Sequence, residues 1–336
     1  MKGIGGKPGW AWIFILEGLA TILIGLVSYF MVHDFPDGAK FLSEDDRLRV
    51  VRRLKEDGQS SAEHEEFKME YFWASFKDWK TWAFATVYMG CDGALYAFSL
   101  FLPTIISELG YKATEANLLS VPPYAAAAVL TVVVGWLADR TQQRGWCNIG
   151  TSFIGIAGFA MLLGSTNPNI KYAGTFLGAL GIYPCVANTV SWAANNTEGV
   201  YKRGVTLGFV IGESWRKSKH LWDKQLIAVC PGWGNLNGVV SSNIYQAKDK
   251  PNYRPGHAVV LAYMVIFLLG GSLVTHFALV AENKKKLAGK KDHLIEGKSE
   301  KEIKAMGDKR YVLVGKTRVC FLVADKTARP DFVYTV

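Results

Sequence analysis

The sequence predicts an all-α membrane protein with about seven transmembrane helices. Half of the 336 residues are hydrophobic, and they are gathered into long apolar stretches, whereas charge is concentrated between Phe35 and Lys80 and between Glu282 and Arg310. A helix rises about 1.5 Å per residue, so about 20 apolar residues cross the roughly 30 Å hydrocarbon layer of a bilayer. Six stretches come close to this length: Trp10–Val32, Trp82–Ile106, Leu118–Ala138, Cys147–Ser165, Lys171–Asn195 and Val259–Ala281.

The first span, in residues 1–32, is followed by a charged linker in residues 33–81. Ser43 with Asp46 three residues on is typical of a helix start, apolar residues follow at helical spacing, and Gly58 is typical of a helix stop. The sequence therefore predicts an amphipathic helix in a linker that we expect on the cytoplasmic side.

The remaining spans fall in residues 82–281, and the sixth span of the chain is interrupted. Gly204–Gly212 is apolar for 9 residues and Gly234–Tyr245 for 12, so neither piece crosses the bilayer alone. The 21 residues between them, 213–233, include Glu213, Arg216, Lys217, Lys219, Asp223 and Lys224. Burying six charges would cost on the order of 15 to 20 kcal/mol. We expect this insert to stay in water.

The excess of positive charge predicts the orientation. The chain carries a net charge of +9, and basic residues between spans are enriched on the cytoplasmic side. If the linker is cytoplasmic, then Arg140, Arg144, Lys202 and the basic tail, residues 282–336, are also inside. This assignment puts the C-terminus in the cytoplasm, and it leaves five basic residues outside: Lys112, Lys171, Lys248, Lys250 and Arg254. Because the basic residues flank spans, we expect no nucleic-acid partner.

Cofactor and enzyme chemistry find little support in the sequence. The five cysteines show no CxxC spacing and no companion histidine pattern. No His, Cys or Asp arrangement with catalytic spacing lies inside the spans. We expect no cofactor, no metal site and no enzymatic activity.

A loop motif follows the third span: Gly135-Trp-Leu-Ala-Asp139-Arg140-Thr-Gln-Gln-Arg144. It resembles the cytoplasmic loop motif of the major facilitator superfamily, whose aspartate lies near a helix dipole and whose basic residues latch one conformational state. The resemblance implies a gating role for Gly135, Asp139, Arg140 and Arg144. The family's second glycine and the basic residue after it correspond here to Gln142 and Gln143. The alternative is that these charges are solvated turn residues.

Longer strings narrow the resemblance. Gly9-Trp-Ala-Trp-Ile-Phe-Ile-Leu-Glu17-Gly18, Leu119-Ser-Val-Pro-Pro-Tyr124, Ser191-Trp-Ala-Ala-Asn195-Asn196 and Gly256-His257-Ala258 resemble the fungal allantoate and nicotinate permeases of the anion:cation symporter group. The match covers that family's sixth to twelfth spans. It implies a partial major facilitator fold in which residues 82–281 are the C-terminal six-helix half. It also implies transport of a small organic anion (a vitamin, ureide or carboxylate), proton symport, and a plasma-membrane location.

Two segments have no counterpart in that family, residues 213–233 and residues 311–328 within the tail. Gly212-Glu213-Ser214 can be encoded with gtgagt and Arg310-Tyr311-Val312 with gtatgt, both common intron starts. We hypothesise that both inserts are translated introns, and we expect five further spans upstream of Met1 in the gene.

Polar residues inside the spans are the candidates for substrate binding. Asp92 and Tyr96 share one helical face with Ser99 in the second span. Asn188, Trp192 and Asn195 repeat this spacing in the fifth span, where amide side chains either bind an organic carboxylate or join helices by hydrogen bonds.

Glu17, in the first span, is the candidate for proton coupling, and pairing with a neighbouring helix is the alternative. His257 and His276 are more typical of packed neutral imidazoles. The sequence thus predicts a proton-coupled transporter of a small organic anion. A transport-incompetent fragment, or a membrane-bound regulatory or binding subunit, is the alternative. The oligomeric state is not indicated.

Overall fold

The computed structural model describes residues 4–31, 41–56, 69–197, 200–211, 237–250 and 252–287, and every regular element in these ranges is a helix. Six helical segments of the described part are long and apolar enough to cross a membrane: Gly9–Met31, Trp79–Ser107, Ala113–Thr141, Arg144–Gly164, Pro168–Asn195 and Arg254–Lys285. They match the six uninterrupted spans that the sequence predicts. The predicted fold class, an all-α membrane protein, is confirmed.

The chain divides into two units, Met1–His64 and Glu65–Val336, and the division falls within the predicted linker. In the first unit, η1 (Ile4–Gly6) precedes α1 (Gly9–Met31), and α1 has no buried residue. The linker helix α2 spans Glu44–Glu56. Ser43 accepts a hydrogen bond from the backbone N–H of Asp46 at 3.2 Å and donates one to its carboxylate at 2.7 Å. The predicted helix start is therefore a true capping interaction.

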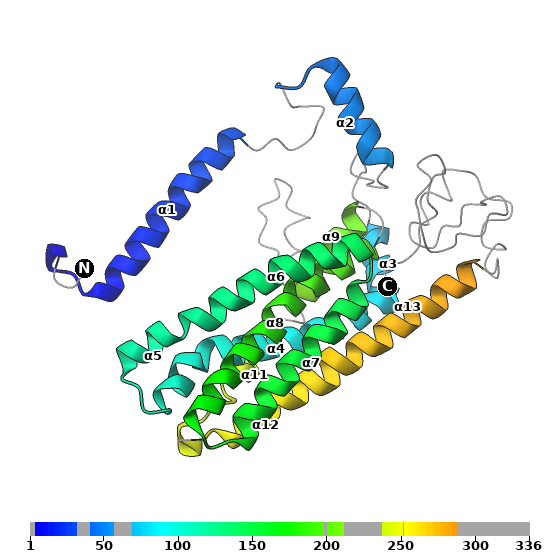
Figure 1. Ribbon diagram of the computed structural model, residues 1–336. Coiled ribbons are helices and arrows are strands. Elements are labelled where there is room, and N and C mark those ends of the chain that lie inside the picture. The colour runs from blue at the N-terminus through cyan, green and yellow to red at the C-terminus, as the bar shows by residue number, and fades with distance from the viewer. Residues whose placement is uncertain are drawn as a thin grey trace. The chain divides into compact units, whose positions relative to one another are not determined.

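The second unit is an up-and-down helical bundle (Figure 1). Its elements are α3 (Met69–Lys77), α4 (Trp79–Ser107), α5 (Ala113–Leu119), α6 (Val121–Thr141), α7 (Arg144–Gly164), α8 (Pro168–Asn195), α9 (Val200–Ile211), α11 (Asn237–Ser241), η4 (Ala247–Asp249), α12 (Arg254–Tyr263), η5 (Met264–Gly270) and α13 (Gly271–Leu287). A π-helical stretch, η5, joins α12 to α13. We call the two ends of this bundle the Asp139 end and the Lys171 end.

Helices α7 and α8 pack with their backbones in contact. A Cβ added at Gly181 would lie 2.2 Å from the Cα of Gly155, and one added at Gly158 would lie 2.3 Å from the backbone nitrogen of Gly178. Small residues allow such close approach, which favours van der Waals contact between helices in lipid. The glycines thereby fix α7 against α8, and these two helices carry most of the polar residues of the candidate site.

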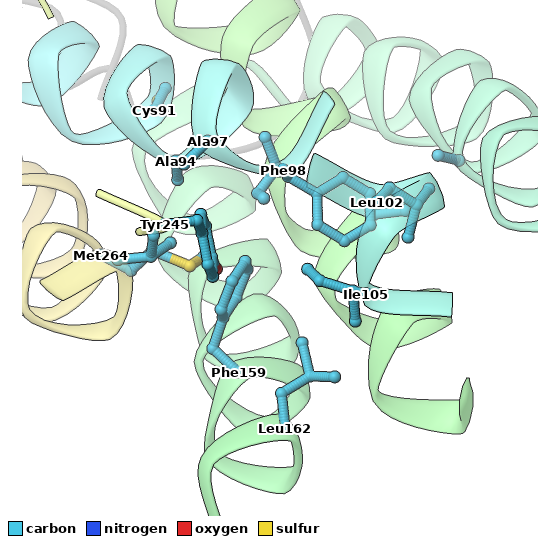
Figure 2. Close-up of a cluster of buried hydrophobic side chains, with 14 of the residues drawn as sticks. Cys91, Ala94, Ala97, Phe98, Leu102, Ile105, Phe159, Leu162, Tyr245 and Met264 are labelled. Carbon is cyan, nitrogen blue, oxygen red and sulfur yellow. The ribbon is translucent and has the colours of Figure 1, made fainter. Parts of the chain in front are cut away.

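A buried apolar cluster joins α4, α7 and η5 (Figure 2). Phe98 and Leu102 of α4 pack with Phe159 of α7, and the rings of Phe98 and Phe159 lie 6.1 Å apart. Met264 of η5 belongs to the same cluster and is fully buried. Burying a large apolar side chain contributes roughly 1.5 to 3 kcal/mol, so this cluster holds the bundle together between its two ends.

The two pieces of the interrupted span both lie along α4. The Phe209 ring of α9 packs against the Trp82 ring of α4, with centroids 5.0 Å apart. The side chain of Asn237, at the start of α11, donates a hydrogen bond to the carbonyl oxygen of Met89 at 3.3 Å. One turn later, the Ser241 hydroxyl donates to the carbonyl of Gly93 at 2.9 Å. The insert itself, residues 213–233, lies outside the described residues.

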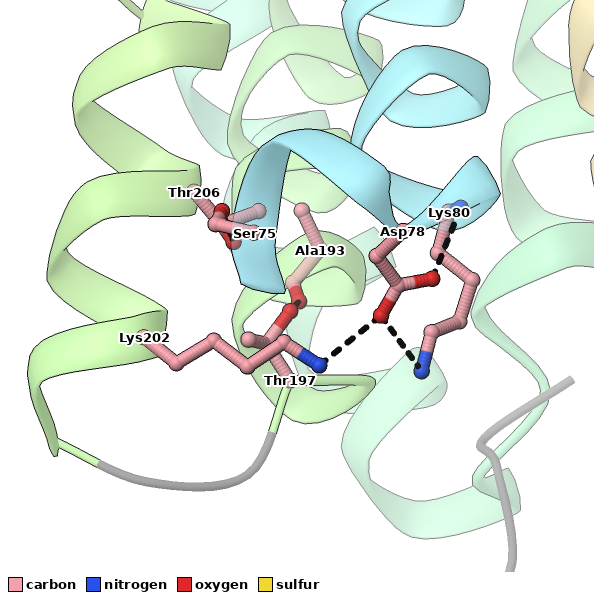
Figure 3. A network of polar contacts seen from close by, with 7 residues as sticks. All are labelled: Ser75, Asp78, Lys80, Ala193, Thr197, Lys202 and Thr206. Atoms are coloured by element: carbon pink, nitrogen blue, oxygen red, sulfur yellow. Dashed lines mark hydrogen bonds and ion pairs between the residues drawn. The ribbon is translucent and has the colours of Figure 1, made fainter. Parts of the chain in front are cut away.

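Buried ionic and hydroxyl contacts fix α9 at the Asp139 end (Figure 3). The Asp78 carboxylate caps α4 by accepting from the backbone N–H of Lys80 at 3.1 Å. It also pairs with the ammonium groups of Lys202 on α9, at 2.8 Å, and of Lys80, at 3.4 Å. The Ser75 hydroxyl lies 2.6 Å from the Thr206 hydroxyl. Helix α3, which supplies Ser75, is a second helix of the linker that the sequence analysis did not single out.

Candidate functional site

An ion pair closes the turn between α6 and α7. Arg144, the first residue of α7, contacts the carboxylate of Asp139 through its guanidinium group. The Arg144 side chain is 9% exposed, whereas that of Asp139 is 67% exposed. A buried guanidinium depends on its partners, because removing one partner leaves an uncompensated charge. The predicted gating residues thus include a charge that lies inside the bundle.

Gln142 occupies a backbone conformation that glycine adopts most readily. Its φ is 56°, and it is the C-cap of α6. Its side-chain amide donates a hydrogen bond to the carbonyl oxygen of Asp139 at 2.7 Å, which satisfies one of the free carbonyls of the helix end. This geometry gives a physical reason for a glycine at the corresponding position of the family motif.

Arg144 continues inward through two amide side chains. Its guanidinium donates to the Asn188 side-chain oxygen at 3.3 Å. The Asn188 amide in turn donates to the Arg144 carbonyl at 2.7 Å and to the Asn148 side-chain oxygen at 3.1 Å. Asn188 therefore joins α8 to α7, and its amide group is already hydrogen-bonded in this conformation.

The polar contacts extend to two further helices. The Asn148 amide donates to the Thr189 hydroxyl at 2.8 Å and to the Ser272 hydroxyl of α13 at 3.3 Å. The Cys91 thiol of α4 lies 3.6 Å from the Thr189 hydroxyl. We call the set Asp139, Arg144, Asn188, Asn148, Thr189, Ser272 and Cys91 the polar chain. It runs from the Asp139 end into the interior and draws on five helices, α4, α6, α7, α8 and α13.

A small cavity adjoins the polar chain. Its volume is about 90 Å³, and its lining residues are Thr131, Gly135, Asp139, Arg144, Pro184, Ala187, Asn188 and Ser191. Gly135, Asp139 and Arg144 from the predicted gate thus meet Asn188 from the predicted binding residues. Ligand pockets usually exceed about 300 Å³, so the cavity has room for a few waters and not for an organic anion.

Asp92 is buried, and one of its two carboxylate oxygens has no hydrogen-bonding partner among the described residues. Its residue surface is 2% exposed, and its Oδ2 atom has no partner within the described part of the chain. Ser99, on the same face of α4, lies 2.9 Å from the Tyr183 hydroxyl of α8. Tyr96 is half-buried between these two residues. A buried carboxyl oxygen without a partner is costly and makes its residue a functional-site candidate in a membrane helix.

The other predicted site residues lie apart from the polar chain. Trp192 is fully buried, and its ring packs edge-on against Phe84 at 5.2 Å. Asn195 is exposed at the end of α8. Glu17 is exposed on α1. Arg140 is exposed and lies 5.3 Å above the Trp136 ring. The assignments of these residues to substrate, proton or gate stay predictions.

The sequence analysis missed Asn148 and Thr189. Arg144, Asn148 and Ser152 recur every four residues in α7, and this spacing puts them on one face of the helix. The polar stripe was a usable signal. The residues of α8 that this stripe contacts are set by the close packing of the glycines of α7 and α8. The sequence of one helix alone does not predict these contacts.

Comparison with known proteins identifies the family. The family model of the Major Facilitator Superfamily matches residues 2–212. The chain belongs to the major facilitator superfamily. An uncharacterized transporter of Schizosaccharomyces pombe is 33% identical over 302 residues, covering 88% of this chain and 57% of the relative.

Two further fungal relatives of the superfamily carry more specific names. The high-affinity nicotinic acid transporter of Saccharomyces cerevisiae is 29% identical over 286 residues, covering 84% of this chain and 49% of the relative. The major facilitator-type transporter hxnP of Emericella nidulans is 27% identical over 315 residues, covering 91% and 59%. The chain thus spans about half the length of the curated relatives it matches. The resemblance to fungal permeases is confirmed, and the partial coverage is consistent with a match to the sixth to twelfth spans.

Proposed function

We propose that this major facilitator chain is one part of a secondary active transporter for a small organic anion such as a vitamin, a ureide or another carboxylate. We further propose that uptake is coupled to protons, that the membrane is the plasma membrane, and that the C-terminus is cytoplasmic. The observation that carries the proposal is the polar chain, which links a buried guanidinium at the Asp139 end to the interior of the bundle. The relative named as a nicotinic acid transporter supports a carboxylate substrate.

The polar chain suits alternating access because its end can open. The Asp139–Arg144 ion pair bridges α6 and α7, and rocking of this bundle against a second half would open the end by drawing Asp139 away from Arg144. Once Asp139 withdraws, the guanidinium of Arg144 and the amide of Asn188 would face the enlarged cavity. Guanidinium groups bind carboxylates through two parallel hydrogen bonds. A carboxylate would then replace Asp139 as the counter-ion of Arg144, which links substrate binding to the state of the gate.

We place Asp92 on the substrate path, where its carboxyl group would act in the protonated form. In its ionised form it would repel an anion, whereas a protonated carboxyl group donates a hydrogen bond to one. Its burial, with one oxygen unpartnered among the described residues, fits a residue whose partner is a transported species.

Uptake by a chimera tests both the function and Asp92. The chimera joins this chain, without residues 213–233, to the N-terminal half of the budding-yeast nicotinic acid transporter, in a host that lacks its own permease. We expect saturable uptake of radiolabelled nicotinate or allantoate, reduced about tenfold or more by Asp92→Asn. Asp45→Asn, which neutralises an exposed carboxyl group on α2, is the control, and membrane insertion should be equal in both variants. Uptake that Asp92→Asn leaves unchanged between about pH 5 and 7 would remove Asp92 from the path.

A second candidate function is favoured by the charged insert, residues 213–233, that interrupts the sixth apolar span in the sequence. A chain with this interruption could bind the anion without transporting it, as a membrane-bound binding or regulatory subunit. Binding of nicotinate by the unaltered chain, together with no uptake by the excised chimera, would favour this alternative.

A further inference from the structure

A buried ammonium group without a carboxylate partner lies at the Lys171 end. Lys171, in the first turn of α8, is 6% exposed, and its Nζ atom donates to the side-chain oxygen of Asn252 at 2.7 Å. No carboxylate forms an ion pair with Lys171 in the described ranges. Lysine is almost never buried unless it is paired. Within the described ranges, the charge of Lys171 is therefore balanced by an amide oxygen and not by a carboxylate.

The surroundings of Lys171 add positive charge. Arg254, the first residue of α12, is close enough to repel the Lys171 ammonium group. Glu108 forms an ion pair with Lys250 at 3.0 Å, and this contact raises the pKa of Lys250. Glu108 is thus partnered by Lys250. Four basic side chains at this end (Lys171, Lys248, Lys250 and Arg254) face two acidic ones (Glu108 and Asp249).

Four of these residues, Lys248, Asp249, Lys250 and Arg254, line an open cavity large enough for a small ligand. Its volume is about 360 Å³, and its lining residues are Lys248, Asp249, Lys250, Asn252, Arg254 and Pro255. Because Lys171 occupies the Asn252 oxygen, the amide nitrogen of Asn252 remains as a donor. The N-terminus of α12 lies at the same place, and its dipole also favours an anion. The lining of the cavity thus combines the guanidinium of Arg254, two lysines, one acidic residue (Asp249) and the amide of Asn252, and the buried ammonium of Lys171 lies behind that amide.

A buried aromatic cluster holds this turn in place. Tyr253, between Asn252 and Arg254, has φ of 45° and is 4% exposed. Its ring lies 5.7 Å from that of Tyr245, whose hydroxyl is 3.0 Å from Nδ1 of His257. A tyrosine in the left-handed region persists only where its surroundings impose it. The positions of Asn252 and Arg254 are consequently set by the core.

We propose that the cavity at the Lys171 end binds the carboxylate of a small organic anion, with Arg254 and Asn252 as direct contacts and Lys171 as the buried counter-charge. This inference rests on the proposed function for the substrate class. It adds a second anion site, at the opposite end of the bundle from Arg144, where an anion is captured before it reaches the interior. An anion there would neutralise Lys171 and would bind less tightly as salt screens the site.

Equilibrium binding of radiolabelled nicotinate to the whole 336-residue chain, in nanodiscs of uncharged lipid, tests the proposal. Arg254→Gln should weaken binding about tenfold, since one charge-assisted hydrogen-bonded partner is lost. Asn252→Asp should abolish binding while keeping or raising the thermal midpoint, because it supplies Lys171 with a counter-charge from within the chain. Lys112→Gln is the matched control: it removes a positive charge at the same end but outside the cavity, and its affinity should equal that of the unaltered chain.

Several results would overturn the site. One is an unchanged dissociation constant in both Arg254→Gln and Asn252→Asp. Another is equal binding of nicotinamide, the neutral analogue, because the cavity would then not recognise the carboxylate. A chain that shows no saturable nicotinate binding overturns it as well. Binding is measured without transport, so a chimera that fails to take up nicotinate does not affect the binding result. If the chimera still takes up nicotinate after Asn252→Asp, the capture site is rejected and the proposed transport function is retained.

Discussion

At the scale of residues, Arg144 decides how the Asp139 end behaves. A guanidinium that is 9% exposed has only a few described partners, the Asp139 carboxylate and the Asn188 amide oxygen. The amide is neutral, so Asp139 supplies the compensating charge. Because Asp139 itself is largely exposed, it can leave the pair at a smaller desolvation cost than Arg144 can. In the gate that we propose, Asp139 is therefore the partner that moves.

Asp139→Ala should lower the maximal rate of uptake by the chimera more than it changes the concentration for half-maximal uptake. The substitution shifts the equilibrium between conformations and removes no contact to substrate. A loss of one to two orders of magnitude in rate corresponds to roughly 1.4 to 2.8 kcal/mol. Arg140→Ala, which alters the exposed neighbour, serves as control and should be nearly neutral. A pure loss of affinity, with the maximal rate retained, would contradict the latch role.

Asp78 predicts how stability depends on pH. Burial alone would raise the pKa of its carboxyl group, but Lys80 and Lys202 outweigh this and lower the pKa below its ordinary value of 3.8. A carboxyl group whose pKa is lowered in the folded state stabilises the folded protein fully above its ordinary pKa. This stabilisation is lost as the pH falls through the pKa of the folded state. Stability should therefore drop below about pH 4.

Thermal unfolding of the chain in detergent, measured from neutral pH to about pH 3, checks this. Asp78→Asn should destabilise the chain at neutral pH by about 3 kcal/mol, as expected when one partner of a buried ion pair is removed, and should flatten the acid limb. Asp46 forms an exposed ion pair on α2, and its side chain is 56% exposed. Asp46→Asn should change neither the stability at neutral pH nor its loss in acid. If Asp78→Asn lost as much stability at acid pH as the unaltered chain, protonation of Asp78 would be ruled out as the cause of the loss.

At the scale of elements, the sequence predicts the spans well because each depends on one long apolar run. The break at Asp78 and the short helix α3 (Met69–Lys77) are different. α3 has too few residues for a clear period, and its position depends on contacts with α9, more than 120 residues later. The same limit applies to the candidate site. Spacing in α8 picks out Asn188, but its bonds to Arg144 and Asn148 follow from how α7 packs on α8.

The interrupted span shows a register that a continuous helix would have. On α4, Trp82 and Met89 are seven residues apart, and they contact Phe209 and Asn237. Those two residues are 28 apart in the chain, and removal of the 21 residues 213–233 would leave them seven apart. Met89 and Gly93, like Asn237 and Ser241, are four apart. Without the 21 residues of the insert, the contact residues of the two pieces therefore have the same spacing along the chain as the α4 residues that they contact.

Removal of residues 213–233 should consequently join α9 to α11 as one 21-residue apolar helix, Gly204–Gly212 with Gly234–Tyr245. We expect higher helicity by circular dichroism and a higher thermal midpoint in detergent, because one continuous helix pairs its backbone groups across the whole hydrocarbon layer. The matched control removes residues 213–235, two residues more than the insert, which would turn α11 by about 200° relative to α9 without leaving a proline behind. That deletion shifts the register and should gain less. Equal midpoints for the two deletions would show that register does not matter.

At the scale of the whole molecule, the second unit is a bundle whose polar residues gather at two places. The Asp139 end carries the ion pair and the small cavity, and the Lys171 end carries the larger basic cavity. In a transporter of this family, two halves enclose the binding site and rock against one another. The chain spans about half the length of its relatives, so the proposed transport depends on what surrounds this bundle.

The chain of 336 residues should therefore bind an organic carboxylate without carrying it across a membrane. Binding needs only the contacts of the Lys171 end, whereas alternating access needs a second half for the bundle to move against and an uninterrupted sixth span. Uptake of radiolabelled nicotinate and allantoate separates these requirements in three chains: the unaltered chain, the chain without residues 213–233, and the excised chain joined to the N-terminal half of the budding-yeast relative. Only the third should transport, with a rate that saturates. Saturable uptake by the unaltered chain would mean that two short helical pieces, α9 and α11, are enough to complete the path, and that a bundle of this size alternates access without a second half. Uptake by the chain without residues 213–233, with no added N-terminal half, would mean that the insert alone prevents transport. A second half would then not be required.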